Sequence, residues 1–215
     1  MKKLCITLFA LATALAGADP SVRPGTIEIT GFGGVNMRLP GANAGALSEQ
    51  LLGIYPPTTG LNQTFPAFGG AIGLAMSHRV MLTGEFMYTP LGAGNFTTVV
   101  TQQTLSAQET SRQYQLMAGL QYLFRTESSR LAPYIGFGLG ASEKAERLTL
   151  GLPAGMVGTA TTATQDQAKI AGNVAAGLRF HITDSFGVRP EFRVMRIPGL
   201  TYFRADAGVF YQFRK

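Results

Sequence analysis

The sequence predicts an all-β chain, folded as a closed barrel of eight antiparallel strands that crosses a membrane. Three observations carry this prediction. Charged residues make up only 14% of the 215 residues, against roughly 25% in ordinary soluble domains. Segments that alternate apolar residues with small or polar ones recur between turn-forming residues. The connections between these segments alternate between short and long, as they do in an up-and-down barrel.

The N-terminus has the pattern of a secretory signal peptide. A basic pair at 2–3 precedes an apolar stretch, and small residues then form an A-x-A site that ends at Ala18. The alternative, a membrane-anchoring helix, needs about 20 apolar residues, and this stretch is shorter. The only cysteine, Cys5, lies inside the stretch, so we expect no disulfide in the exported chain. We predict a signal peptide over residues 1–18 and one outer-membrane barrel domain over residues 19–215.

Eight later segments have the length of tilted transmembrane strands, which need about 9–11 residues. Gly, Pro, Ser and Thr separate them, and no continuous apolar run among them is long enough for a spanning helix. In chain order the predicted strands are 26–38, 64–77, 80–90, 111–124, 131–144, 169–182, 186–196 and 202–213.

The connections predict which ends of the strands lie together. Short connections follow the second, fourth and sixth strands, whereas long ones occupy residues 39–63, 91–107 and 148–167. The connection at 198–201 is also short and departs from the pattern. Short periplasmic turns and longer extracellular loops are typical of membrane barrels, so we expect that arrangement.

The fifth strand indicates which face meets lipid. Its apolar face includes Ile135 and Phe137, and its other face includes Gly136, Gly138 and Gly140. Glycine weakens a strand and suits a crowded interior better than a solvated surface. The small and polar face is therefore predicted to point inward, with the apolar face toward lipid. The strands at 111–124, 169–182 and 202–213 alternate in the same way.

Aromatic residues then fall at two levels, provided that the first strand starts at the periplasm. Two aromatic girdles are typical of membrane barrels, although aromatic residues are also simply common in strands. The predicted periplasmic girdle contains Tyr122, Phe124, Phe180, Tyr211 and Phe213, with Phe186 nearby. The outer level contains Phe68, Phe86, Tyr88, Tyr114 and Phe203.

Eight charged residues fall on inward faces. They are Glu28, Glu85, Arg179, Arg189, Glu191, Arg193, Arg204 and Asp206. Burying such charges is costly unless they pair, so we predict an interlocked lumen network with a structural role. A final hairpin turning at residues 199–200 would place Arg193 opposite Asp206, and the preceding turn would place Arg179 opposite Arg189. An ion pathway is the alternative, but eight strands enclose a space that side chains can fill.

The sequence resembles the small eight-stranded outer-membrane barrels of the OmpA and OmpX type. The resemblance is carried by "LAPYIGFGLGAS", "AAGLRFHITDSFGVRPEFRVMR" and the closing "RADAGVFYQF". It implies location in the Gram-negative outer membrane and insertion by the barrel assembly machinery, which reads a C-terminal aromatic residue. Here that residue is Phe213, which is followed by Arg214 and Lys215.

Little in the sequence points to catalysis. Two histidines, His78 and His181, are the only histidine bases, and both are predicted near the periplasmic end. No cluster has the spacing of zinc ligands, so no metal or cofactor is expected. The basic residues are scattered, which argues against nucleic acid.

The long loops are the place where interaction is expected, because exposed loops on a rigid scaffold commonly bind partners. The predicted function is a non-enzymatic barrel with a structural or surface-interaction role through its extracellular loops. A narrow pore and a soluble secreted ligand-binding barrel remain as alternatives. Four basic residues near the outer rim are candidates for lipopolysaccharide phosphates or for interfacial anchoring: Arg38, Arg112, Lys144 and Arg147.

Overall fold

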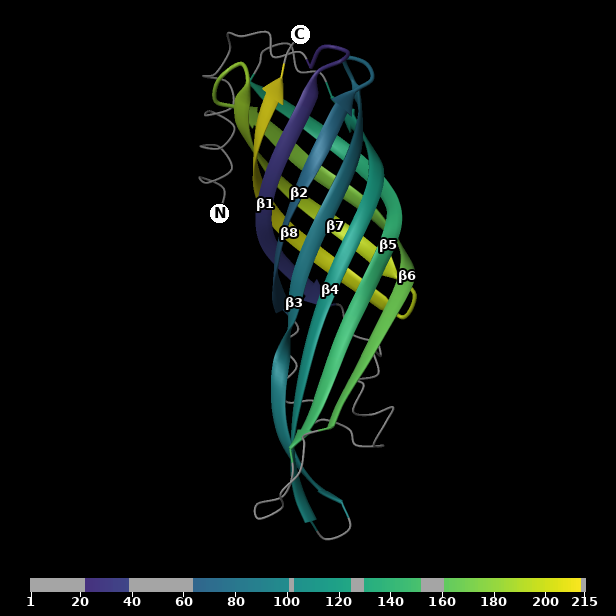
Figure 1. Cartoon of the computed structure of the whole chain (residues 1–215). Coiled ribbons are helices and arrows are strands. Elements are labelled where there is room, and N and C mark those ends of the chain that lie inside the picture. Colours follow the sequence, from purple (N-terminus) through teal and green to yellow (C-terminus); the bar gives the residue numbers. More distant parts are fainter. Residues whose placement is uncertain (1–21, 39–63, 101–102, 125–129, 152–160, 214–215) are drawn as a thin grey trace, which may run out of the picture.

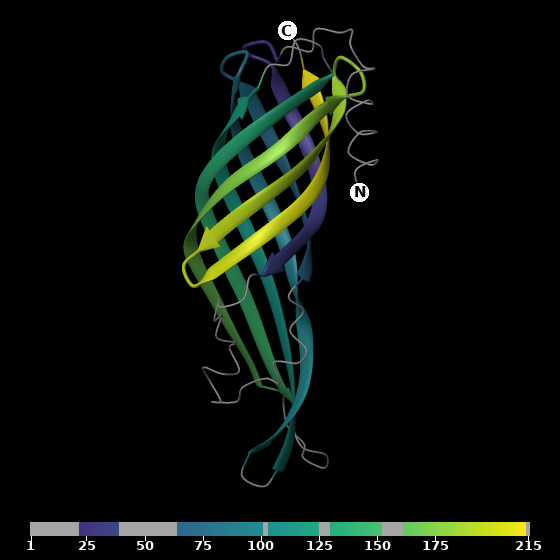
Figure 2. The same ribbon diagram turned by 180° about the vertical axis from the view of Figure 1, so that it is seen from behind.

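A computed structural model describes residues 22–38, 64–100, 103–124, 130–151 and 161–213. These residues form a closed barrel of eight antiparallel strands, each paired with its neighbours in sequence, and the barrel closes between the first and last strands (Figures 1 and 2). The strands are β1 (Ile27–Arg38), β2 (Thr64–Ala75), β3 (Val80–Val100), β4 (Gln103–Leu123), β5 (Leu131–Gly151), β6 (Thr161–His181), β7 (Phe186–Ile197) and β8 (Leu200–Phe213). The predicted signal peptide and the connection at 39–63 lie outside the described residues.

The strands are staggered as barrel closure requires. Following paired positions once around the barrel from Glu28 leads back to β1 at Arg38, ten residues further along. A stagger of this kind tilts the strands against the barrel axis, typically by about 35–45°. Tilted strands of 12 residues, such as β1 and β7, are therefore long enough to cross a bilayer.

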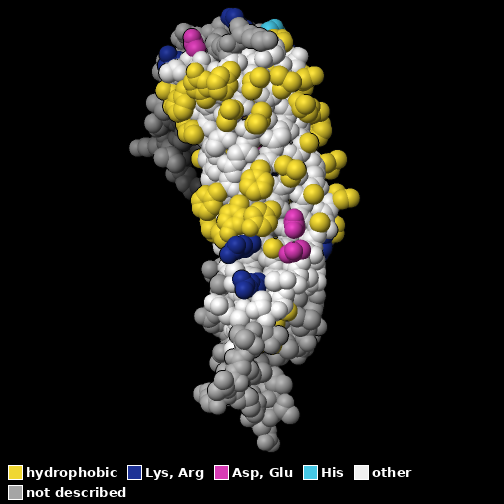
Figure 3. All heavy atoms as spheres, viewed as in Figure 1, with side chains coloured by type: hydrophobic (Ala, Val, Ile, Leu, Met, Phe, Trp, Pro, Cys, Tyr) yellow, Lys and Arg dark blue, Asp and Glu magenta, His cyan; other side chains and the backbone are white. Residues whose placement is uncertain are grey.

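The apolar side chains of the alternating pattern lie on the outside. On β5, Ile135, Phe137 and Leu139 are 50–68% exposed, whereas Tyr134, on the other face of the same strand, is 1% exposed. Figure 3 shows apolar side chains spread over the barrel wall, with charged groups beyond their lower edge. This confirms the predicted direction of the two faces. Within the described residues, no helix is long and apolar enough to span a membrane.

Four strands are longer than predicted. β3, β4, β5 and β6 have 21 residues each, whereas β1, β2 and β7 have 12. Most of 91–107 and much of 148–167, predicted as loops, are therefore strand. We call residues 91–100, 103–112, 143–151 and 161–170 the projecting sheet, which extends beyond the other four strands in Figures 1 and 2. The sequence of the projecting sheet is rich in threonine and only weakly apolar, so the alternation that predicts the other strands is missing there. A strand beyond the lipid needs no apolar outer face.

The hairpin between β7 and β8 also differs from the prediction. Its turn is Pro198–Gly199, because Ile197 pairs with Leu200. Proline fixes φ near −65° at the first turn position, and Gly199 takes φ of +83° at the second, as a type II turn requires. The register consequently shifts, and Arg193 lies opposite Arg204 while Glu191 lies opposite Asp206. The predicted pairing of Arg193 with Asp206 is wrong.

Candidate functional site in the barrel lumen

All eight predicted lumen charges point inward and are buried. None of them is more than 8% exposed. We call these eight residues the lumen network. Four are arginines and four are carboxylates, so the network is formally neutral. Strands from opposite sides of the barrel contribute to it, which brings together residues that lie more than 100 positions apart in sequence.

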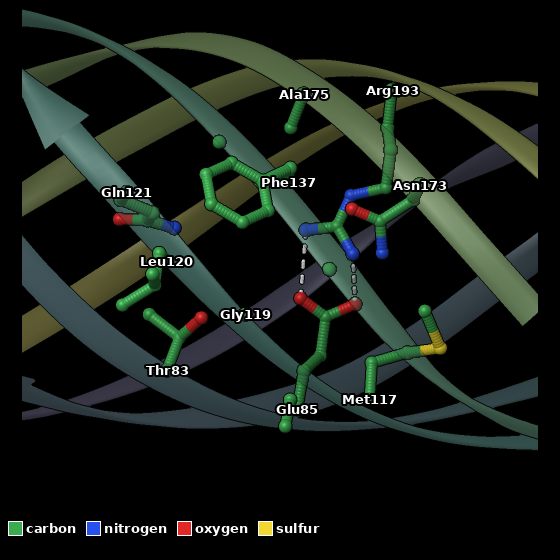
Figure 4. Close-up of a pocket in the computed structure, with 13 residues that line it drawn as sticks. Thr83, Glu85, Met117, Gly119, Leu120, Gln121, Phe137, Asn173, Ala175 and Arg193 are labelled. Carbon is green, nitrogen blue, oxygen red and sulfur yellow. Dashed lines mark hydrogen bonds and ion pairs between the residues drawn. The ribbon is translucent and has the colours of Figure 1, made fainter.

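Glu85 on β3 is the centre of the network. Its two carboxylate oxygens accept hydrogen bonds from Arg193 Nη1 and Nη2 of β7, at 2.6 and 2.7 Å. Arg204 Nη2 of β8 donates to the same carboxylate at 2.9 Å. Figure 4 shows the paired Glu85 and Arg193. Bidentate contacts of this kind are among the stronger hydrogen bonds in proteins, so Glu85 ties three strands together across the lumen.

Glu191 joins this centre from β7. It accepts a hydrogen bond from Arg193 Nε at 2.8 Å, and Arg204 Nη2 lies 3.6 Å from the same carboxylate oxygen. The Tyr134 hydroxyl of β5 donates to its other oxygen. Glu191 therefore balances the two arginines that face each other across the β7–β8 pair, Arg193 and Arg204.

Asp206 is held less firmly in the lumen network than Glu85 and Glu191 are. Its Oδ2 lies 2.7 Å from Arg204 Nε, yet neither atom has an aligned hydrogen-bond partner in the described part of the chain. The pair is electrostatic without the directional bond that Glu85 makes. The Asp206 side chain is nevertheless buried, with only 1% of its surface exposed.

A second group lies closer to the end of the barrel with the short turns, which we call the turn end. There Arg179 Nη2 of β6 pairs with Glu28 of β1. Gln212 donates to Glu28 at 3.0 Å, and Arg179 donates to Gln121 at 3.2 Å. The Arg179 guanidinium also stacks on Phe210, 5.0 Å from the ring centre. Both charges are thus paired and further hydrogen-bonded, as buried ions require.

Arg189 lies beside the aromatic ring of Tyr134. The pairs on either side, Gly177 with Glu191 and Phe180 with Val188, keep the register that sets Arg189 across from Arg179. Within the described residues its Nε has no hydrogen-bond partner, and its guanidinium lies 6.0 Å from the centre of the Tyr134 ring. An aromatic face attracts a cation and partly replaces an ion pair. Arg179 therefore lies opposite Arg189 as predicted, and the ion pair with Glu28 offsets the repulsion between the two arginines from the Arg179 side.

Apolar side chains occupy the lumen on both sides of the network. Toward the opposite end, which we call the loop end, the cluster includes Met87, Met117, Met195 and Tyr202. Toward the turn end, Ala75, Met81 and Leu123 pack together with Tyr134. The network is therefore enclosed between two buried apolar layers.

A small cavity remains beside the Glu85–Arg193 pair. Its volume is about 20 Å³, which is room for about one water molecule. Thr83, Gln121 and Asn173 line it together with this pair (Figure 4). Glycines at 119, 136 and 138 in its wall leave the space that larger side chains would fill. The cavity is lined largely by polar groups, and a space of this volume can hold water but no larger solute.

Sequence reasoning missed several partners of the network. Alternation places Tyr134, Gln121 and Gln212 on inward faces, but nothing in the sequence pairs them with particular charges. The contacts of arginines with Phe32, Met87 and Phe210 were likewise unforeseen. They depend on which strands face each other across the barrel, and that follows from strand number and stagger together.

The predicted periplasmic girdle residues lie on the outer face near the turn end. Tyr122, Phe124, Tyr211 and Phe213 are 39–51% exposed, and Phe180 is half-buried. Tyr122 packs edge-on against Phe124 at 5.3 Å between ring centres, and Tyr211 packs edge-on against Phe213 at 4.9 Å. Near the loop end, Tyr88 and Tyr114 lie 5.3 Å apart, and Phe192 stacks on Phe203 at 5.9 Å.

Of the four basic rim residues, only two lie on the outer face. Arg112 of β4 and Arg147 of β5 are exposed there. Lys144 is on the inner face of β5, where its Nζ lies 2.5 Å from Glu146 Oε1. Arg38 shares the inward register of Asn36 and is half-buried. Lys144 and Arg38 therefore do not face lipid, since strand alternation turns them inward.

The histidines lie near the turn end. His78 is on the exposed β2–β3 turn, with Nδ1 3.3 Å from the Val22 carbonyl oxygen. His181 is buried and packs edge-on against Phe210 at 5.0 Å. In the described ranges, no group of three or more His, Cys, Asp or Glu residues is arranged to hold a metal ion.

Comparison with known proteins identifies the fold. The family described as the outer membrane protein beta-barrel domain matches residues 4–213. The crystal structure of Ail, the attachment invasion locus protein of Yersinia pestis, superposes with a TM-score of 0.52 at 14% identity, covering 89% of this chain and 100% of Ail. Neisserial surface protein A gives a TM-score of 0.51 at 14% identity, covering 88% and 99% of the two chains. Ail in complex with the heparin analogue sucrose octasulfate also gives 0.51 at 14% identity, with coverage of 88% and 99%. No curated protein sequence matches the chain.

Proposed function

We propose, for a chain that belongs to the outer membrane protein β-barrel family, a non-enzymatic role in surface interaction, with the projecting sheet as the element that meets the partner. The observation that carries the proposal is the length of β3–β6, which run beyond the other four strands while the lumen is filled. A filled lumen leaves the outer surface as the place for function. Long strands would hold that surface away from the membrane.

The projecting sheet supports this role through its open edge. Beyond Gly172, toward the loop end, β6 continues to Thr161, and within the described residues no strand pairs with it on its β7 side. Every residue from Thr162 to Ile170 is exposed or half-exposed. Unpaired backbone donors and acceptors on an edge strand are a template for an added strand or a polar ligand. β7 and β8 are joined by only two residues, so that turn cannot cover the edge.

Membership of the family makes this an outer-membrane protein. We further propose that the signal peptide at 1–18 directs export and that the barrel assembly machinery inserts the chain. The last described residue, Phe213, ends β8 as an exposed aromatic and supports recognition of that kind. By this proposal the turn end faces the periplasm and the loop end faces outward.

The test compares the full chain with a shortened variant. Removing 94–109 and 148–163, with two-residue turns joining Ala93 to Thr110 and Arg147 to Thr164, uses positions that already pair across strands. Both proteins are expressed in the same Gram-negative host, and binding of the cells to immobilised heparin and to cultured epithelial cells is measured. Heparin is a first probe because Ail shares the fold and was crystallised with a heparin analogue.

We expect the shortened variant to lose the binding that the full chain confers, at equal amounts of folded barrel on an unheated gel. Equal binding by both proteins would contradict the role of the projecting sheet. A narrow pore is the second candidate, and the charged lumen with its water-sized cavity is the observation that favours it. Single-channel conductance separates the two functions.

A further inference from the structure

Four exposed charges surround one residue on the outer face of the barrel. Ala145 of β5 pairs with Arg112 of β4 on one side and with Asp166 of β6 on the other. Glu143 and Arg147 lie two residues before and after it, so all four side chains share its face. We call Arg112, Glu143, Arg147 and Asp166 the charge cross. Each of the four positions lies roughly 4.5–7 Å from Ala145, so a small ligand placed over Ala145 is within reach of side chains from several of them.

The charge cross lies where the apolar surface ends. The next outward residues toward the barrel are Tyr114 on β4, Ala141 on β5 and Ala168 on β6, which Ile170 follows on the same face. Figure 3 shows basic and acidic side chains directly beyond the lower edge of the apolar surface. Aromatic residues mark the level of the lipid headgroups in membrane barrels, and Tyr114 packs with Tyr88 and Phe86 there. The cross is therefore at headgroup level.

The four residues of the charge cross form no ion pairs with one another in the described part of the chain. None of the ion pairs found in the described part of the chain involves any of them. All four side chains are exposed. This contrasts with the lumen, where the charges are closely paired. Mixed charges left unpaired beside a membrane are available to the headgroups of the lipids around them.

We propose that the charge cross binds a phosphate group of an outer-leaflet lipid together with a divalent cation. Arg112 and Arg147 donate hydrogen bonds to the phosphate oxygens, a contact for which the planar guanidinium is suited. Glu143 and Asp166 would repel a bare phosphate. A divalent cation shared between these carboxylates and the phosphate removes the repulsion, because Mg²⁺ and Ca²⁺ take oxygen ligands.

The site stands whether or not the projecting sheet binds a partner. The shortened variant keeps all four residues of the cross, so the two proposals fail separately. Diphosphoryl lipid A is a suitable probe, since it carries phosphates on an acylated sugar. Lipid A with its phosphates removed is the matched control for the ligand.

The experiment measures lipid A bound to the refolded full chain in an uncharged detergent with Mg²⁺, by native mass spectrometry. Replacing both arginines, Arg112→Gln with Arg147→Gln, should weaken binding about tenfold or more, as expected for the loss of two charge-assisted contacts. The control is Arg196→Gln, an exposed arginine of β7 near the loop end that bonds to Thr201 and lies outside the cross. It should bind as the unaltered chain does, and dephosphorylated lipid A should bind weakly to all of them.

Chelation with EDTA tests the cation. It should weaken binding to the unaltered chain and have little effect on Glu143→Gln with Asp166→Asn. Equal lipid binding by the double arginine variant and the Arg196 control would contradict the proposal that the charge cross binds the lipid phosphate. If EDTA does not change lipid binding, no divalent cation takes part in the site. If millimolar inorganic phosphate competes as effectively as lipid A does, the ligand is a free phosphate and not a lipid.

Discussion

Glu85 holds two arginines from different strands, and this makes it the residue on which the lumen depends most. Breaking a buried ion pair by removing one partner leaves the other charge uncompensated, at a cost of about 3–5 kcal/mol. The carboxylate accepts two bonds from Arg193 and one from Arg204. Asp206 contacts Arg204 alone and without aligned geometry. The two carboxylates should therefore differ in importance although both are buried.

The first prediction ranks these residues. Glu85→Gln should lower the free energy of unfolding by about 3–5 kcal/mol, and Asp206→Asn by less. Exposed Glu143→Gln is the control and should change it by no more than about 1 kcal/mol. Urea unfolding of the refolded proteins in micelles measures all three. Equal effects for Glu85 and Glu143 would show that the lumen pairs do not stabilise the barrel.

Two glycines of β1 provide a second test at this scale. A methyl group added at Gly34 would overlap the Ala205 carbonyl oxygen and the Asp206 backbone, whereas one added at Gly31 meets nothing within 4 Å. Gly34 thus allows β1 and β8 to close the barrel at that point.

The second prediction follows from this difference. Gly34→Ala should destabilise the barrel by about 1–3 kcal/mol or prevent refolding, as overpacking does. Gly31→Ala should refold normally. The fraction that migrates as a folded barrel on an unheated gel is the measurement. Normal refolding of both variants would mean that the β1–β8 seam has more room than the structure shows.

At the scale of elements, the strands have two parts: the segments that cross lipid need an apolar outer face, and the segments that project into water do not. Alternation predicted the eight strands and their faces correctly where each strand crosses the apolar belt. It missed the continuation of β3–β6, because stretches such as 161–164 pair without any alternation of apolar and polar residues in their sequence. It also missed the β7–β8 register, since either of two adjacent turns fits the same residues until Pro198 and Gly199 are read as a type II turn.

The third prediction concerns the independence of these two parts. The shortened variant should still refold and show the heat-dependent gel shift, because all eight strands keep their pairing across the belt. Its loss of stability should be small beside that of Glu85→Gln. A variant that fails to refold under conditions that refold the full chain would indicate that the projecting sheet is part of the folding unit.

At the scale of the whole molecule, composition and face alternation were enough to predict the barrel and the inward position of all eight charges. They were not enough to predict which charges meet. Arg179 reaches Glu28 and Arg204 reaches Glu85 across the lumen, and these contacts depend on the stagger of the closed sheet. The outcome is a neutral network between two apolar layers, which supports the interpretation that the lumen stabilises the barrel and the outer surface carries function.

The measurement that tests this account most directly is planar-bilayer conductance of the refolded full chain, with the heat-dependent gel shift confirming that the barrel has formed. A lumen filled by paired charges and apolar side chains should give no channel steps in molar salt. Reproducible steps from the folded protein, altered in ion selectivity by Glu85→Gln, would contradict the account and make the lumen network the lining of a pore.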